Sequence, residues 1–510
     1  MHEHPSPAEN HWFSTSNPLA QQIPYYSDPE QLASDLAFNP VDGLDLANLS
    51  ITEIDELLIG EKTPLEPTMQ IIRTALTWHS MLHAGLRRRN PNVAKARQLY
   101  WEAVLHKPNG KTHPFMSPTR GISVQVVKGT TGTGKSVTMA RFCKLFPQVI
   151  RHGANSIAGW EALTQLVYLE VAISHDGTRG GFLTNILVQI DIALGTSYAI
   201  DLPRKHKTVE RLAVATVCRL VAHYTGILFL EEGQLRNLVL SGQANLMQDF
   251  LLMLMNSGIP IVFLGNEAAF NWITYSQDSN RLYTTPSEHF MPTGAIAMNA
   301  EAQEEATMEW DAIARGIMSY YCLTLPISDP EECKKQLRKC SGGIPRLALF
   351  LWCMAQRNAL FQGQESFGSK DISLVYESSA YKEHRNLADG FYFRKSDLLQ
   401  DIEDVDTKLY DTYWGSVTRE PTVALQTTAQ VRAAQKGESK ENEIKKKTPV
   451  KAPKSGRAKF KAEQTRQKNQ DAKRNELLKN LPDGDIRSSG LVAHHLKGFQ
   501  DALAAARGAE

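Results

Sequence analysis

One short glycine-rich segment constrains the fold of this chain more than any other feature. Residues 129–136 read Gly-Thr-Thr-Gly-Thr-Gly-Lys-Ser and match the pattern G-x-x-x-x-G-K-[ST] at every position. The residues before it, 122–128, are rich in β-branched side chains and predict a buried strand, and residues 137–146 predict a helix. Strand, glycine loop and helix start form a phosphate cradle, because backbone N–H groups converge there on an anion. The segment therefore predicts an α/β fold and a site for a nucleoside triphosphate.

The residues of this P-loop have different expected tasks. The Lys135 ammonium supplies a positive charge for phosphate binding and catalysis, and the Ser136 hydroxyl is an expected ligand of Mg²⁺. The residues that we expect to bind the nucleotide are Gly129, Thr130, Thr131, Gly132, Thr133, Gly134, Lys135, Ser136 and Val137. ATP and Mg²⁺ are thus the expected cofactors.

An apolar segment farther along the chain ends in two carboxylates. Residues 227–230 (Ile-Leu-Phe-Leu) are followed directly by Glu231 and Glu232. Adjacent side chains in a strand point to opposite faces, so two different tasks require the strand to end between them. We assign Glu231 to Mg²⁺ and Glu232 to the attacking water. The alternative is an ordinary acidic loop after a strand.

Three further residues are candidates for contact with the terminal phosphate. Asn266 follows the apolar segment 259–264 and is expected to position the lytic water, although Gly-Asn is also a common turn. Arg346 lies in the first turn of a helix that begins after Ser-Gly-Gly-Ile-Pro, and is expected to reach the γ-phosphate. Arg281 is expected to act on the phosphate of a neighbouring subunit, with Arg315 as the competing candidate. For Arg346 the alternative is a surface position on its helix.

The arrangement of apolar segments predicts the architecture. Candidate strands at 122–128, 165–172, 226–230, 259–264 and 321–326 alternate with helical segments, which favours a parallel sheet covered on both faces. We divide the chain into an extended and helical N-terminal region (1–115), a nucleotide-binding core (116–326), a helical lid (327–390) and a C-terminal tail (391–510). The tail is expected to be largely disordered, because it is rich in Lys, Gln and Glu and poor in aromatic residues.

Charge and cysteine content suggest partners and compartment. The net charge of the chain is only +1, but residues 436–474 carry fourteen Lys and Arg against five Asp and Glu. Such a basic tail predicts a polyanionic or acidic partner. Six cysteines without C-x-x-C spacing are expected to be reduced core thiols of a cytoplasmic protein. No apolar segment reaches about 18 residues, so we expect no membrane contact.

Two basic segments could contact nucleic acid. Arg204, Lys205 and Lys207, in the segment Arg-Lys-His-Lys, are expected to bind the DNA backbone independently of sequence, although a solvated basic loop is the alternative. Residues 87–91 (Arg-Arg-Arg-Asn-Pro) could likewise touch nucleic acid, or could neutralise the C-terminal end of a helix.

Taken together, the P-loop, the Glu-Glu strand end, the Asn strand tip and the Gly-Ile-Pro-Arg helix start resemble the AAA+ ATPases. Several segments resemble more narrowly the TnsC family, the AAA+ regulators of transposition in Tn-seven-like transposons. These segments are residues 17–19, 89–91, 146–150, 167–169, 174–177, 192–197 and 481–485. The chain departs from that family at Glu231, where Asp is usual, and a longer side chain there is expected to slow hydrolysis.

The resemblance implies a nucleotide-binding core with a helical lid and a function in DNA transposition. Members of the family assemble with ATP as rings or filaments on double-stranded target DNA. They link a target-selection protein, at the N-terminal side, to the transposase, at the C-terminal tail, and hydrolysis disassembles them. Two other interpretations stay open: a nucleotide-gated DNA-binding scaffold with little turnover, and a replication initiator or helicase loader.

Overall fold

The computed structural model describes residues 17–60, 62–105, 123–173, 178–231, 244–267, 285–402 and 404–415. The chain divides into two units, residues 1–418 and 419–510, and every described residue belongs to the first. The predicted basic tail at 436–474 lies outside the described residues, as do Glu232, Arg281 and residues 174–177.

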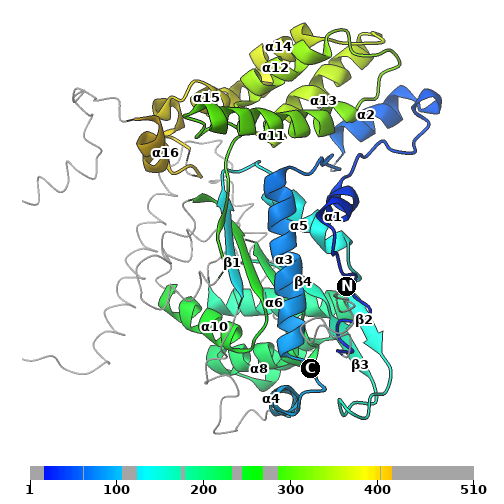
Figure 1. Cartoon of the computed structure of the whole chain (residues 1–510), viewed down its shortest axis with the longest axis vertical. Helices are drawn as coiled ribbons and strands as arrows, with labels where there is room; N and C mark the ends of the chain where they lie inside the picture. The colour runs from blue at the N-terminus through cyan, green and yellow to red at the C-terminus, as the bar shows by residue number, and fades with distance from the viewer. Residues whose placement is uncertain are drawn as a thin grey trace, which may run out of the picture. The chain divides into compact units, whose positions relative to one another are not determined.

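A parallel sheet forms the centre of the described structure (Figure 1). Within the described ranges it has five strands in the order β4-β5-β6-β1-β7, and every neighbouring pair is parallel. Its strands are β1 (Val124–Gly129), β4 (Tyr168–Ala172), β5 (Ile227–Glu231), β6 (Ile261–Gly265) and β7 (Glu288–Phe290). A separate antiparallel hairpin joins β2 (Val149–His152) to β3 (Leu163–Leu166). The α/β class and the parallel sheet predicted from the apolar segments are confirmed.

The register of the sheet brings the ends of three strands together. Lys128 of β1 is paired with Gly265 of β6, and Glu231 of β5 is paired with Leu264 of β6. The residues that follow these positions, including the P-loop and Asn266, therefore meet at the carboxyl edge of the sheet. This is the edge at which parallel α/β sheets bind ligands.

One of the predicted strands is divided and another is wrong. Residues 165–172 belong partly to β3 of the hairpin and partly to β4 of the sheet. Residues 321–326 form no strand, and the edge beside β1 is occupied by β7 instead. The apolar side chains that suggested a strand pack on two cores instead. Cys322 packs with Ile54 and Leu58 in a small core, and Tyr321 and Leu323 pack on the core of the helices that follow β7. The β7 strand, Glu-His-Phe, is too short and too polar to be recognised from its pattern.

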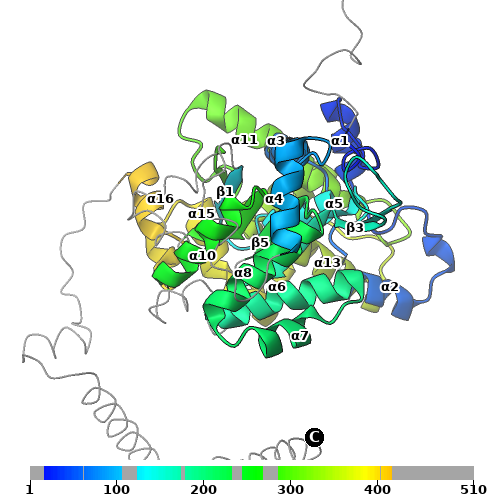
Figure 2. The same ribbon diagram turned by 90° about the horizontal axis from the view of Figure 1, so that it is seen from below.

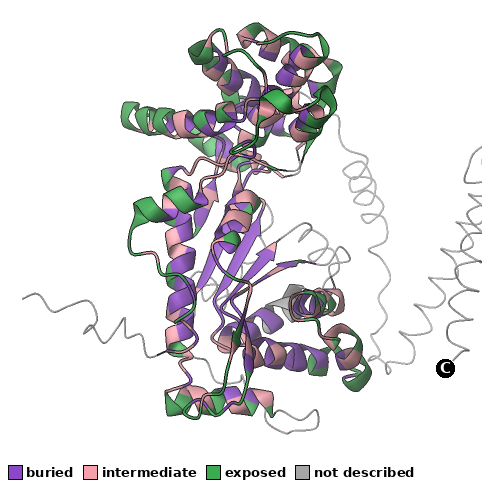
Figure 3. Cartoon of the chain, turned by 90° about the vertical axis from the view of Figure 1, so that its right-hand side faces the viewer, coloured by how far each residue is buried: buried purple, intermediate pink, exposed green. Residues whose placement is uncertain are grey.

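Helices bury the sheet, as Figure 3 shows by the buried strands between them. Two of these helices are α3 (Met69–Arg88) and α5 (Lys135–Lys144). Trp78 of α3 packs edge-on against Phe142 of α5 and Phe229 of β5, with ring centroids 5.4 and 5.2 Å away. The other helices of this part are α4 (Ala94–Val104), α6 (Arg179–Leu194), α7 (Tyr198–Lys205), α8 (Val209–Ala222) and α10 (Ala244–Asn256). Of these, α6, α7 and α8 pack on one another (Figure 2).

A second hydrophobic core lies among the helices that follow β7, and we call these helices the helical cluster. Its members are α11 (Ala300–Ser319), α12 (Pro330–Ser341), α13 (Pro345–Phe361), α14 (Ser369–Glu377), η6 (Ser379–Tyr381), α15 (Lys382–Tyr392), η7 (Ser396–Leu399) and α16 (Thr407–Trp414). Trp352 is fully buried at its centre, and its indole N–H donates to the carbonyl oxygen of Tyr320 at 2.8 Å.

The N-terminal segment contacts both cores. It contains α1 (Pro29–Leu36), η2 (Leu46–Asn48) and α2 (Ile51–Ile59), and Ser50 with Glu53 forms a capping box at the start of α2. Arg141 of α5 donates to the carbonyl oxygens of Leu36 and Ala37, at the end of α1. The α2 helix instead packs on α13 of the helical cluster, so this one segment joins the sheet to the cluster.

The basic segment at the end of α3 is partly structural. The Arg89 guanidinium donates to the carbonyl oxygens of Thr225 and Gly226, at 2.6 and 3.2 Å, and to Gly85 of its own helix. Of the two interpretations left open for residues 87–91, Arg89 therefore supports the structural one. Arg88 is exposed at the same turn.

The structure bears on two expectations from the sequence, which concern the cysteines and membrane-spanning helices. All six cysteines lie within the described residues, and all are free and buried, as predicted for core thiols. Among the helices in the described part of the chain, none combines the length and the apolar character that a membrane crossing requires.

Candidate functional site

Glycines shape the P-loop where a side chain would not fit. A Cβ on Gly129 would lie 1.9 Å from the carbonyl oxygen of Phe290, because β7 runs directly beside the end of β1. Gly132 and Gly134 have φ angles of +89° and +101°, in the left-handed region that favours glycine. Gly134 is the N-cap of α5, so the backbone turns sharply from the loop into the helix. The first N–H groups of α5 therefore face the loop.

Lys135 is a buried cation within this loop. Its Nζ donates to the carbonyl oxygens of Gly129 and Thr130, at 2.8 and 2.9 Å. The hydroxyl of Thr133 donates to the same Thr130 carbonyl at 2.8 Å and tightens the turn. A buried ammonium is stable only when it is solvated by such oxygens, and phosphate oxygens can replace them.

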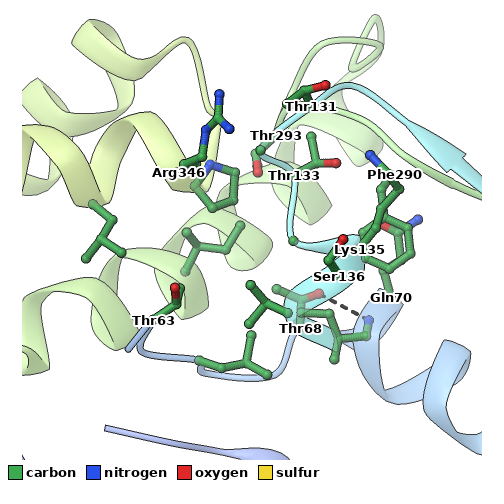
Figure 4. Close-up of a pocket in the computed structure, with 18 of the residues that line it drawn as sticks. Thr63, Thr68, Gln70, Thr131, Thr133, Lys135, Ser136, Phe290, Thr293 and Arg346 are labelled. Carbon is green, nitrogen blue, oxygen red and sulfur yellow. Dashed lines mark hydrogen bonds between the residues drawn. The ribbon is translucent and has the colours of Figure 1, made fainter. Parts of the chain in front are cut away.

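A cavity of about 420 Å³ opens beside the loop, between the sheet edge and the helical cluster. It brings together most of the residues that the sequence pattern selects. Those that line it are Thr131, Gly132, Thr133, Gly134, Lys135, Ser136, Val137, Glu231, Asn266 and Arg346. Gly129 and Thr130 do not line it. Figure 4 shows Thr131, Thr133 and Arg346 at one end of the cavity, and Thr63 and Thr68 at the other.

The far end of the cavity is apolar, and nothing in the sequence pattern pointed to it. Residues 63–66, before α3, form part of its wall, together with α11 and α13. The apolar side chains there are Leu65, Ile71, Ile313, Ile317 and Leu349. Thr68 caps α3, since its hydroxyl accepts from the Ile71 N–H. An apolar wall with a few polar groups suits a planar base.

The sheet edge contributes two polar side chains to the cavity. Glu231 is half-buried at the end of β5, on the strand next to that of Asn266. Asn266 follows β6, and its amide oxygen lies 3.2 Å from the hydroxyl of Thr131 in the P-loop. Glu231 and Ser136 line the same cavity, as a shared Mg²⁺ requires.

Arg346 attaches the helical cluster to the P-loop. It follows Pro345, the first residue of α13, and its backbone N–H donates to the carbonyl oxygen of Gly132 at 3.1 Å. Its side chain lines the cavity. Because Arg346 belongs to the helical cluster and lines the cavity, a phosphate bound at the P-loop would attract this cation and so favour one position of the cluster.

A buried carboxylate behind the P-loop escaped the sequence analysis. Glu267, next to Asn266, accepts hydrogen bonds from His289 at 2.8 Å, from Tyr410 at 2.5 Å and from Thr130 at 3.3 Å. Burial alone would raise the pKa of Glu267, but the hydrogen bonds from His289, Tyr410 and the Asp406 N–H lower it below its usual range. Glu267 therefore connects the P-loop to α16 as an ionised group. Its only signal in the sequence was its position directly after Asn266.

The family comparison agrees with this geometry. A family model described as AAA domain matches residues 120–273, which contain the P-loop, Glu231 and Asn266. Residues 120–273 form an AAA domain. No curated protein matches the chain.

Solved structures with some similarity to the chain include three archaeal proteins. Cdc6p from Pyrobaculum aerophilum is 14% identical, with 61% of this chain and 67% of that one covered and a TM-score of 0.36. The ORC2 protein of Aeropyrum pernix is 13% identical, with 64% and 73% covered and a TM-score of 0.35. The ORC1 protein of Aeropyrum pernix, solved in complex with DNA, is 15% identical, with 63% and 68% covered and a TM-score of 0.32.

The basic candidates do not line this cavity. Arg204 and Lys205 end α7, Lys207 follows, and all three side chains are exposed. Arg315, the competitor of Arg281, lies on α11, where its guanidinium is 3.5 Å from the carboxylate of Glu66. Because Glu66 lines the cavity, Arg315 lies close to the cavity of its own chain.

Proposed function

We propose that this chain is an ATP-dependent, DNA-binding AAA+ regulator of DNA transposition. The observation that carries the proposal is the cavity of the AAA domain, in which Lys135, Ser136, Glu231, Asn266 and Arg346 meet. These residues supply groups for binding phosphate and Mg²⁺ and for orienting the water, and they come from the P-loop, two strand ends and a helix of a different core.

In this proposal the apolar end of the cavity takes the base, and the P-loop takes the phosphates. Lys135 and the N–H groups at the start of α5 bind the phosphate oxygens, and Arg346 neutralises charge at the terminal phosphate. The Ser136 hydroxyl and the Glu231 carboxylate would hold Mg²⁺, which neutralises phosphate charge when it is bound.

Hydrolysis also needs an oriented water and a base. We assign the orientation of the water to Asn266, and its position in the cavity lining at the end of β6 supports this assignment. The predicted base, Glu232, lies outside the described residues, directly after Glu231. Arg281, also outside them, remains our candidate for a charge contributed to a neighbouring subunit.

The part in transposition depends on the segments that resemble the TnsC family and on the charge of the chain. We propose that the protein assembles with itself on double-stranded DNA when ATP is bound. Its N-terminal region would meet a target-selection protein, and its basic tail would meet the transposase. Arg204, Lys205 and Lys207 would contact the DNA backbone, since an exposed basic segment binds phosphates without reading bases.

Negative-stain microscopy of the full chain with duplex DNA tests this function. We expect rings or filaments with a non-hydrolysable ATP analogue and none with ADP. Lys135→Ala should abolish them, because it removes the buried cation of the P-loop. Lys144→Ala, which changes an exposed lysine of the same helix, should leave them intact.

Phosphate release with and without DNA distinguishes the remaining alternative. Assembly that depends on ATP but shows no turnover above background would favour a nucleotide-gated scaffold. Absence of any assembly on DNA with the ATP analogue would contradict the proposed function.

A further inference from the structure

The last described segment of the chain contacts two residues of the proposed nucleotide site. Residues 404–414, which we call the clasp, include α16 and lie just before the unit that begins at residue 419. The Asp404 carboxylate accepts a hydrogen bond from Nδ2 of Asn266 at 2.8 Å. Its other oxygen lies 3.0 Å from the hydroxyl of Thr131. The clasp thus touches both the P-loop and the strand tip.

These contacts decide how the Asn266 amide is oriented. An ionised carboxylate can only accept hydrogen bonds, so Asp404 must face the NH₂ end of the amide. The carbonyl end then faces the Thr131 hydroxyl, 3.2 Å away. Without Asp404, the two ends of the amide could exchange places at little cost. A reversed Asn266 would present an acceptor where it now presents a donor.

A second set of hydrogen bonds holds the clasp at this position. The Tyr410 hydroxyl donates to Oε1 of Glu267 at 2.5 Å, and the Asp406 N–H donates to Oε2 at 3.0 Å. Tyr410 is fully buried, and Glu267 is 4% exposed. Two consecutive residues of the strand tip, Asn266 and Glu267, are therefore each bound by the clasp. Such double attachment limits the movement of Asp404 relative to Asn266.

We propose that Asp404 is the positioning residue of Asn266, so that the clasp is part of the nucleotide site. The proposal rests on the proposed function, since it assigns Asn266 to the γ-phosphate and the water. Asp404 does not line the cavity; we assign its action to the contact with Asn266, and the double variant below separates this from its contact with Thr131. It also connects the last described segment of the chain to the proposed nucleotide site, through the hydrogen bond between Asp404 and Asn266.

The test compares Asp404→Ala, Asp404→Asn and Asn266→Ala in the full chain, with Asp401→Ala as a matched control. Asp401 is an exposed carboxylate three positions earlier. The readouts are kcat and KM for ATP with DNA, and the Kd values of ADP and of a slowly hydrolysed ATP analogue. The ratio of these two Kd values reports the contacts to the γ-phosphate even in a protein that does not turn over.

We expect Asp404→Ala to lower kcat by about tenfold to 100-fold, as for misplaced groups at a reacting centre. The preference for the ATP analogue over ADP should fall by about tenfold, while the Kd of ADP changes less than twofold. Asp404→Asn should retain most of the activity, because its amide can accept from Asn266 and donate to Thr131. In the Asn266→Ala background, Asp404→Ala should have no further effect.

Three results would overturn the proposal. One is unchanged or faster turnover in Asp404→Ala with an unchanged preference for the ATP analogue. Another is an equal loss of affinity for ADP and for the analogue, which would indicate a structural role. The third is an additive loss in the double variant. A wild-type chain without turnover would contradict the proposed ATPase, whereas the Kd ratio would still decide the role of Asp404.

Discussion

The backbone N–H of Arg346 donates to the carbonyl oxygen of Gly132, with 3.1 Å between the two atoms. Through this bond the first turn of α13 is attached to the middle of the P-loop. A nucleotide that moves the loop must therefore also act on the helical cluster.

Gly132 is the position at which this attachment is most easily disturbed. Its φ of +89° is unfavourable for other residues, and a Cβ there would lie 3.0 Å from Cβ of Arg346. We expect Gly132→Ala to lower the free energy of unfolding by about 1–2 kcal/mol and ATP affinity by about tenfold, since each tenfold change corresponds to ~1.4 kcal/mol. Gly153→Ala is the control, because its Cβ would meet no atom within 4 Å. Thermal unfolding and nucleotide titration would measure both, and equal affinities of the two variants would contradict the expectation.

Two buried histidines make the docking of the N-terminal segment sensitive to acid. Nε2 of His79 accepts from the backbone N–H of Tyr26 at 3.1 Å, and Nε2 of His83 lies 3.2 Å from the carbonyl oxygen of Pro24. Burial is the main cause that lowers the pKa of both His79 and His83 to about 4. For His79, the charges of His83 and Arg87 contribute to this lowering of the pKa.

The direction of the pH effect on stability follows from the difference between the folded and the unfolded pKa of these histidines. Above the unfolded pKa of 6.5 both histidines are neutral in either state, and the full stability is present. As the pH falls from 6.5 toward 4, the unfolded chain binds protons that the folded chain excludes, and stability is lost, on the order of 3 kcal/mol for each histidine. Urea unfolding at pH 7.5 and 5 should show the part of this loss that accrues above pH 5, and His79→Gln should reduce it. A stability that does not change over this range would contradict the neutral, buried state.

The ion pair between Asp55 and Arg357 docks α2 on the helical cluster. Nε of Arg357 lies 2.6 Å from the Asp55 carboxylate, and both side chains are partly buried. A double-mutant cycle with Asp55→Ala and Arg357→Ala should give a coupling energy of about 1 kcal/mol, since the pair is partly shielded from water. The exposed pair Glu332–Lys335 on α12 is the control, and there we expect less than about 0.5 kcal/mol. Equal coupling in the two cycles would show that burial of the first pair has no effect.

The proposed DNA contact of α7 is testable through salt dependence. Replacing Arg204, Lys205 and Lys207 by Gln should weaken binding equally on unrelated duplexes. The slope of log K against log salt should fall by about 0.9 for each cation that contacts a phosphate. A triple Gln variant of three exposed lysines of the helical cluster is the control, at positions Lys335, Lys339 and Lys370. An identical slope in the wild type and the α7 variant would exclude this segment from the DNA interface.

Local sequence determined the P-loop, the approximate positions along the chain of four parallel strands and the polar residues at their ends. The glycines of residues 129–134 permit a backbone that other residues resist, and continuous apolar segments have few stable places outside a buried parallel sheet. Lys135, Ser136, Glu231, Asn266 and Arg346 could be selected because each stands at a strand end or a helix start that the pattern marks. The meeting of these five in one cavity follows from the parallel direction of the strands.

Only the tertiary structure decided the rest of the site. The edge strand β7 and the apolar wall from residues 63–66 have no pattern of their own. Residues 321–326 have a strand-like pattern but pack among helices. Asp404 is 273 residues from Thr131 in the chain, and Tyr410 is 143 residues from Glu267. Hydrogen bonds between such distant residues depend on how the core of the sheet and the core of the helical cluster pack on each other. This packing depends on many side-chain contacts between residues that are far apart in the chain, so no short segment of sequence predicts it.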